Sequence, residues 1–97
     1  MLSGTYLCAV TLRGKERHGT LTMVEEPDGT IHATAKILGY KLKSTGRALG
    51  DGFDFVGTQR VLVKTYPYHV FGCVDGDLLV ATAQVGERRY ETYGVRQ

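Results

Sequence analysis

The sequence predicts an all-β fold, a small eight-stranded antiparallel up-and-down β-barrel, and three observations lead to this prediction. Short stretches alternate apolar and polar residues with a period of two, which is typical of strands with one buried face. Thirteen glycines against two prolines indicate tight turns and bulges between these stretches. No stretch shows the period of a helix. At 97 residues, we expect a single domain spanning 1–97.

Four alternating stretches fill the first half of the chain. Residues 5–12 alternate Thr, Tyr and Val, which favour strands, and end at a polar turn. Residues 19–24 place Leu and Met on one face and Thr on the other, and the following Glu-rich loop contains Pro, Asp and Gly, which favour turns. Residues 30–38 alternate Ile and Ala with His, Thr and Lys. Residues 40–45 alternate again until a glycine ends the stretch.

The second half repeats this order. Residues 53–65 have strand character, and an aromatic bend at 66–69 leads into residues 70–74. Asp75-Gly76 follows and favours a two-residue type I′ hairpin turn, because Asp and Gly tolerate positive φ. Residues 78–85 and 88–95 form the last two predicted strands.

The two halves resemble each other, with half-repeats at about 4–49 and 57–97. The glycine landmarks before the second loop are 53 positions apart, and an Ala-Thr-Ala tripeptide recurs at a spacing of 48. The landmarks are Gly4 and Gly57, Gly19 and Gly72, and the tripeptides 33–35 and 81–83. We interpret this as an internal two-fold duplication that yields an eight-stranded meander. The barrel is favoured over a β-sandwich because closure removes exposed strand edges.

Five motifs span nearly the whole chain: Gly4-Thr5-Tyr6, Gly19-Thr20-Leu21-Thr22, Gly52-Phe53-Asp54-Phe55-Val56-Gly57, Gly72-Cys73-Val74-Asp75-Gly76-Asp77 and Gly94-Val95-Arg96. With them the chain resembles small glycine-punctuated β-barrel domains of Gram-positive anaerobes, which are sometimes appended to flavin-dependent oxidoreductases. The resemblance implies a calycin-like barrel, similar to lipocalins or streptavidin, and no catalytic residues. The chain departs from those domains at Leu12-Arg13-Gly14 and Tyr66-Pro67-Tyr68, where they carry Pro-Met-Gly.

Inward-facing polar and aromatic residues form the predicted ligand site. Strand parity and the two repeat spacings bring five residues to one cavity or its rims: Tyr6, Tyr40, Gln59, Arg88 and Tyr90. Apolar walls with a few polar groups are typical of small-ligand pockets. We therefore expect non-enzymatic binding of a flat or amphipathic small molecule. The alternative is that these side chains fill a solid barrel core.

A second hypothesis is an interaction or self-association module, which makes a homo-oligomer possible. Tyr66, Tyr68 and Phe71 concentrate aromatic residues at one bend, and such residues are enriched at interface hot spots. The competing interpretation is a tyrosine-rich turn that covers one end of the barrel.

Other classes of function are disfavoured. His18, His32 and His69 show no metal-ligand spacing, so we expect no metal and no cofactor. Cys73 is expected to pack in its hairpin rather than act as a nucleophile, and an enzyme is the least favoured class. Without a signal peptide, Cys8 and Cys73 are expected to be reduced thiols in the cytoplasm. The net charge of +2 is too small to indicate a nucleic-acid partner. No apolar stretch approaches the ~18 residues of a membrane helix, so we expect no membrane partner either.

Overall fold

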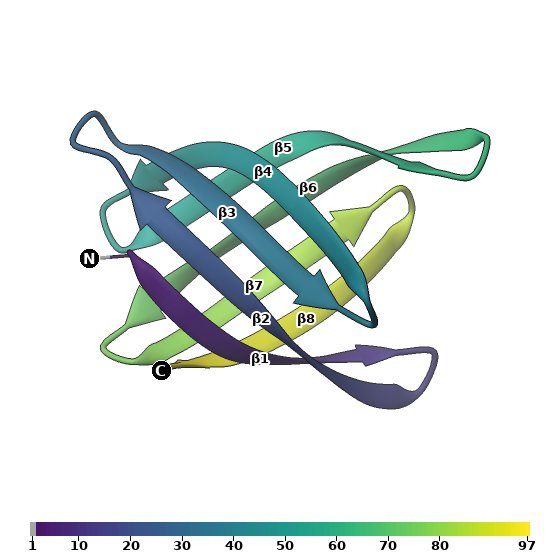
Figure 1. Ribbon diagram of the computed structural model, residues 1–97, viewed down its shortest axis with the longest axis horizontal. Helices are drawn as coiled ribbons and strands as arrows, with labels where there is room; N and C mark the ends of the chain where they lie inside the picture. The colour runs from purple at the N-terminus through teal and green to yellow at the C-terminus, as the bar shows by residue number, and fades with distance from the viewer. Residues whose placement is uncertain (1) are drawn as a thin grey trace.

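The computed structural model describes residues 2–97, and for Val61 the backbone alone. Over these residues, eight antiparallel strands close into one barrel in sequential order, and β8 pairs back to β1 (Figure 1). The strands are β1 (Gly4–Leu12), β2 (Lys15–Glu25), β3 (Thr30–Ile37), β4 (Tyr40–Leu49), β5 (Gly52–Val61), β6 (Lys64–Asp75), β7 (Leu78–Val85) and β8 (Arg88–Arg96). The predicted all-β class and up-and-down barrel are confirmed, and the sandwich alternative is wrong.

The predicted hairpin at residues 70–80 is present, but its turn lies one residue further along the chain. Asp75 pairs with Leu78, so the two loop residues are Gly76 and Asp77. Gly76 has a φ of 61°, and Asp77 is not among the residues with positive φ. Glycine at the first loop position with positive φ there alone is typical of a type II′ turn rather than the expected type I′ turn.

The aromatic bend expected at 66–69 is instead part of β6. Pro67 pairs with Thr58 of β5, and its carbonyl oxygen accepts a hydrogen bond from the Gly86 amide at 2.9 Å. Pairing between β6 and β7 starts only at Tyr68. At Pro67, β6 is therefore not yet paired with β7, so the missing N–H of proline breaks no hydrogen bond of that ladder.

The hydrophobic core fills the end of the barrel where β1 begins and β8 ends (Figure 1). Its fully buried side chains are Leu2, Tyr6, Met23, Ile31 and Leu79. Phe53 and Phe55 of β5 pack beside them, with ring centroids 5.8 Å apart. We call this the packed half of the barrel.

Strand pairing loosens toward the opposite end. Among the described residues, β4 and β5 pair only through Gly46–Leu49 and Gly52–Phe55. Beyond that point the two strands diverge, and β5 continues with β6 as a hairpin that projects past the barrel (Figure 1). The β1–β2 hairpin also projects, and the molecule measures 37 Å along its longest axis against 26 and 21 Å across. We call this part the open half.

The strand bounds agree with one of the two repeat spacings. β3 and β7 have bounds 48 residues apart, and so do the turns that follow them. β2 and β6 begin 49 residues apart, at Lys15 and Lys64, rather than at the predicted 53. The internal duplication remains a prediction.

Candidate functional site

Apolar and aromatic side chains line the interior of the open half, and they remain partly exposed to solvent. Directly opposed residues of antiparallel strands share a face, so Tyr90, opposite the core-side residue Ala83, points inward. The inward side chains of this half are partly exposed, and Leu42 keeps 37% of its surface accessible. They include Val10, Ile37, Leu42, Tyr66, Tyr68 and Tyr90.

A side-chain bridge spans the point where β4 and β5 separate. The Tyr68 hydroxyl of β6 lies 2.7 Å from the Ser44 hydroxyl of β4, so it reaches across β5 to make this hydrogen bond. Gly57 of β5 allows the crossing, because a Cβ atom there would lie 2.6 Å from the Tyr68 hydroxyl oxygen. The bridge joins β4 to β6 where backbone pairing between β4 and β5 has ended.

A cleft of about 510 Å³ lies beside this bridge. Ala33, Val56 and Tyr68 contribute apolar surface to it, while Lys43 and His32 contribute polar groups. Its volume is within the range of small-molecule sites. The open half therefore has a solvent-accessible recess next to its interior.

Tyr6 lies apart from the other predicted ligand residues. It is fully buried in the packed half, where its hydroxyl donates a hydrogen bond to the Leu2 carbonyl at 2.9 Å. The Arg96 guanidinium carbon lies 5.2 Å from the centre of its ring. Burial raises the pKa of Tyr6, and the positive charge of Arg96 opposes this only in part. Tyr6 therefore lies in the core of the packed half and not in the open half.

The other four predicted ligand residues lie toward the open end, although they do not form one wall. Tyr90 lines the interior. Tyr40 directly follows the β3–β4 turn and is 69% exposed, and Arg88 directly follows the β7–β8 turn and is also exposed. Gln59 lies opposite Tyr66 and donates to the Arg60 carbonyl at 3.4 Å. Tyr40, Gln59 and Arg88 thus lie near the open end of the barrel rather than in the wall of its interior.

The three predicted interface residues do not form a single surface. Tyr66 and Tyr68 share the inward parity of β6, whereas Phe71 has the outward parity and its ring lies 4.8 Å from the His69 ring. Each of the three is only partly exposed.

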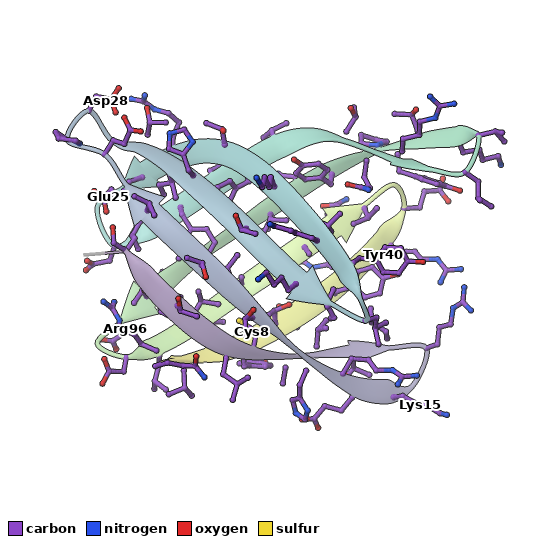
Figure 2. All side chains as sticks on the ribbon, viewed as in Figure 1. Cys8, Lys15, Glu25, Asp28, Tyr40 and Arg96 are labelled. Carbon is purple, nitrogen blue, oxygen red and sulfur yellow. The ribbon has the colours of Figure 1, made fainter. Side chains whose placement is uncertain are left out.

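The charges of the molecule are separated along the barrel, which the net charge of +2 hides. Figure 2 shows Lys15 at the open end, and Glu25 and Asp28 at the packed end. Near the turns of the open end lie Arg13, Lys15, Arg17, Lys36, Lys41, Arg60, Lys64, Arg88 and Arg89, with Glu16 and Glu87. Near the opposite end lie Glu25, Glu26, Asp28, Asp51, Asp54, Asp75 and Asp77, with Arg47 and Arg96. We call these the basic end and the acidic end.

Two leucines occupy turn positions that normally favour glycine. Leu38 and Leu62 have φ angles of 52° and 57°, in the left-handed region, and both lie at turns of the basic end. A non-glycine residue there costs roughly 1–2 kcal/mol. Leu62 and its neighbour Val63 are 89% and 88% exposed, so burial of these side chains does not offset the cost.

Two histidines pair with carboxylates on the outer surface of the barrel. His69 and Asp54 contact each other at 2.6 Å on the outer face of β5 and β6, and His32 contacts Glu26 at 2.7 Å. Within residues 2–97, no group of three His, Cys, Asp or Glu side chains is arranged to hold a metal ion.

The two cysteines differ in environment. Cys73 is exposed on the outside of β6, so the prediction that it packs in its hairpin is wrong. Cys8 is buried, and burial raises its pKa, which keeps the thiol protonated. Both are free thiols.

No protein-family model matches the chain, and no curated protein matches it. In the part of the chain that the structure describes, no helix is long and apolar enough to cross a membrane.

Proposed function

We propose that this protein binds a small amphipathic anion in the open half of its barrel and catalyses no reaction on it. One observation carries the proposal: the apolar and aromatic interior of the open half is only partly covered, while that of the packed half is fully buried. Concave apolar surface with a few polar groups is the usual character of a ligand site. The calycin-like resemblance remains a prediction that agrees with this function.

The arrangement suggests how such a molecule would be held. Its apolar part would contact Tyr90 and neighbouring inward side chains, and its anionic group would lie near Arg88 at the mouth. The surplus of Lys and Arg at the basic end favours a negative charge there. The divergence of β4 and β5 offers a lateral entrance, at whose inner limit Ser44 and Tyr68 are hydrogen-bonded.

We place this function in the cytoplasm. Both cysteines are free, and Cys73 is exposed, which suits a reducing compartment. The ligand would then be a metabolite or lipid-derived anion of the cell interior.

A matched pair of tyrosines in β8 tests the ligand site. Tyr90 points inward, whereas Tyr93 lies on the outer face of the same strand and is 61% exposed. Titration with a fluorescent medium-chain fatty carboxylate should give saturable binding that Y90A weakens about tenfold or more, because an aromatic contact is lost. Y93A should bind like the unmodified protein. Equal effects of the two substitutions, or no saturable binding, would contradict the proposal.

Self-association is a second candidate, and the separated charges favour a head-to-tail form of it. The basic end of one copy complements the acidic end of the next. Light scattering at low and high salt distinguishes the two candidates. Oligomers that dissociate with salt would support self-association, and a monomer at every concentration and low salt would exclude it.

A further inference from the structure

The most exposed large apolar side chains described in this protein lie together at one tip. Leu62 and Val63 form the β5–β6 turn, and they are 89% and 88% exposed. This hairpin projects beyond the rest of the barrel (Figure 1). Arg60 and Lys64, both exposed, flank the two apolar residues on the arms of the same hairpin.

A neighbouring turn repeats the combination of apolar and basic side chains. Leu38 and Tyr40 are 53% and 69% exposed at the β3–β4 turn, and Lys36 and Lys41 lie beside them, also exposed. Figure 2 shows Tyr40 and Lys15 at this same end of the molecule. The basic end therefore presents projecting apolar side chains among cationic ones.

Leucine is an unfavourable residue for the backbone conformation at these turns. Leu38 and Leu62 hold left-handed φ angles of 52° and 57°, as Arg13 does at 51°, whereas glycine holds this conformation at Gly50, Gly76 and Gly86. Strained positions are a reason to look for a function of the side chain. Here that side chain is apolar and exposed to solvent, so its function requires an apolar partner.

We propose that the basic end docks on an anionic lipid bilayer, with Leu62 and Val63 inserted at the level of the headgroups. Charge complementarity selects this partner: the surrounding Lys and Arg residues attract lipid phosphates, while the acidic end is repelled and faces away. A projecting tip suits a deformable bilayer, whereas a folded protein would need a matching pocket. The net charge alone did not indicate a membrane partner, because the positive charge of the basic end and the negative charge of the acidic end nearly cancel.

Docking of this kind is reversible and needs both the apolar tip and the basic residues around it. One apolar anchor alone gives marginal binding to a bilayer, and a basic patch adds the second contribution. Each Lys or Arg close to an anionic surface strengthens binding by about fivefold. Membrane docking does not depend on the proposed ligand binding, because the tip lies outside the interior of the barrel.

The absence of tryptophan from the chain allows a direct test. V63W places a single indole at the tip, and L49W places one at an exposed leucine of the acidic end, where Leu49 is 69% exposed. Vesicles of phosphatidylcholine and phosphatidylserine should shift the V63W emission to shorter wavelength, and brominated lipid should quench it. L49W should show neither change, and vesicles of phosphatidylcholine alone should leave both proteins unchanged.

Vesicle flotation with unlabelled variants measures the two contributions. L62S/V63S should lower the affinity for anionic vesicles at least tenfold. R60Q/K64Q should lower it about 25-fold, on the basis of two charges lost. The matched control L49S/L78S removes two exposed leucines of the acidic end and should not change the affinity. Thermal melts of all variants identify any that fail to fold.

Three outcomes would overturn the proposal. The first is no association of the unmodified protein with anionic vesicles at low salt. The second is an equal loss in L62S/V63S and L49S/L78S. The third is a salt-sensitive oligomer that L62S/V63S abolishes without any vesicle binding, which would make the tip an interface between copies. Y90A should keep full vesicle binding, so failure of the ligand proposal is distinguishable from failure of this one.

Discussion

Replacing Leu62 with glycine should stabilise this protein, although the change removes an apolar side chain. Leu62 has a φ of 57°, and the left-handed conformation costs a non-glycine residue roughly 1–2 kcal/mol. The side chain is 89% exposed, so its removal sacrifices little burial. Glycine adds about 0.5–1 kcal/mol of conformational entropy to the unfolded chain. The free energy of unfolding of L62G should therefore rise by about 0.5–1 kcal/mol.

The adjacent residue provides the matched control. Val63 is 88% exposed, but it is not among the described residues with positive φ. V63G thus relieves no strain and should lower the free energy of unfolding by about 0.5–1 kcal/mol. In a chain of this size L62G should melt about 2–8 °C higher than the unmodified protein, and V63G should melt lower. An L62G protein no more stable than V63G would refute the strain argument.

Three other outcomes follow from the packing of the barrel. G46A should lower the free energy of unfolding by about 1–3 kcal/mol in urea titration, because a Cβ atom there would clash with the Asp54 carbonyl oxygen. An unchanged midpoint would show that β4 shifts freely. Burial raises the pKa of Tyr6 and of Cys8, so both groups favour the folded state while they are protonated. The urea midpoint should therefore fall as the pH rises past about 9, and it should fall less steeply in Y6F. A thiol reagent should label Cys73 quickly and Cys8 only on unfolding, and equal labelling rates in the native protein would contradict the assigned burial.

The fold was predictable because its signals are local. The alternation in residues 30–38 and 78–85 predicts two strands whose bounds the structure reproduces within one residue. The turn after Asp75 was misplaced by one position because Asp75-Gly76 and Gly76-Asp77 are both acceptable two-residue turns. Only the register of the paired strands selects between them.

The candidate site was only partly predictable, because parity assigns a face and not a depth. Tyr6 and Tyr90 both point inward as expected, yet Tyr6 is fully buried in the packed half and Tyr90 lies in the open half. Depth along the barrel depends on the stagger of all eight strands, which no single stretch encodes. Tyr40 has inward parity but is 69% exposed, since it directly follows a turn.

The charge separation becomes visible only with the observed turns, because the turn at 62–63 lies within the stretch 53–65 that was predicted as strand. In an up-and-down meander, alternate turns lie at the same end of the barrel. Grouping the turns at 13–14, 38–39, 62–63 and 86–87 collects most of the Lys and Arg residues at one end. The total of +2 averages this pattern away.

An NMR titration shows directly whether the open half is a ligand compartment. Backbone amide spectra of the labelled protein would be recorded with increasing decanoate, a short amphipathic anion. We expect saturable shifts at Ser44, Gly57 and Tyr90 in the open half, and unchanged signals at Met23 and Ile31 in the packed half. Spectra that do not change, or shifts centred on the packed half, would contradict it.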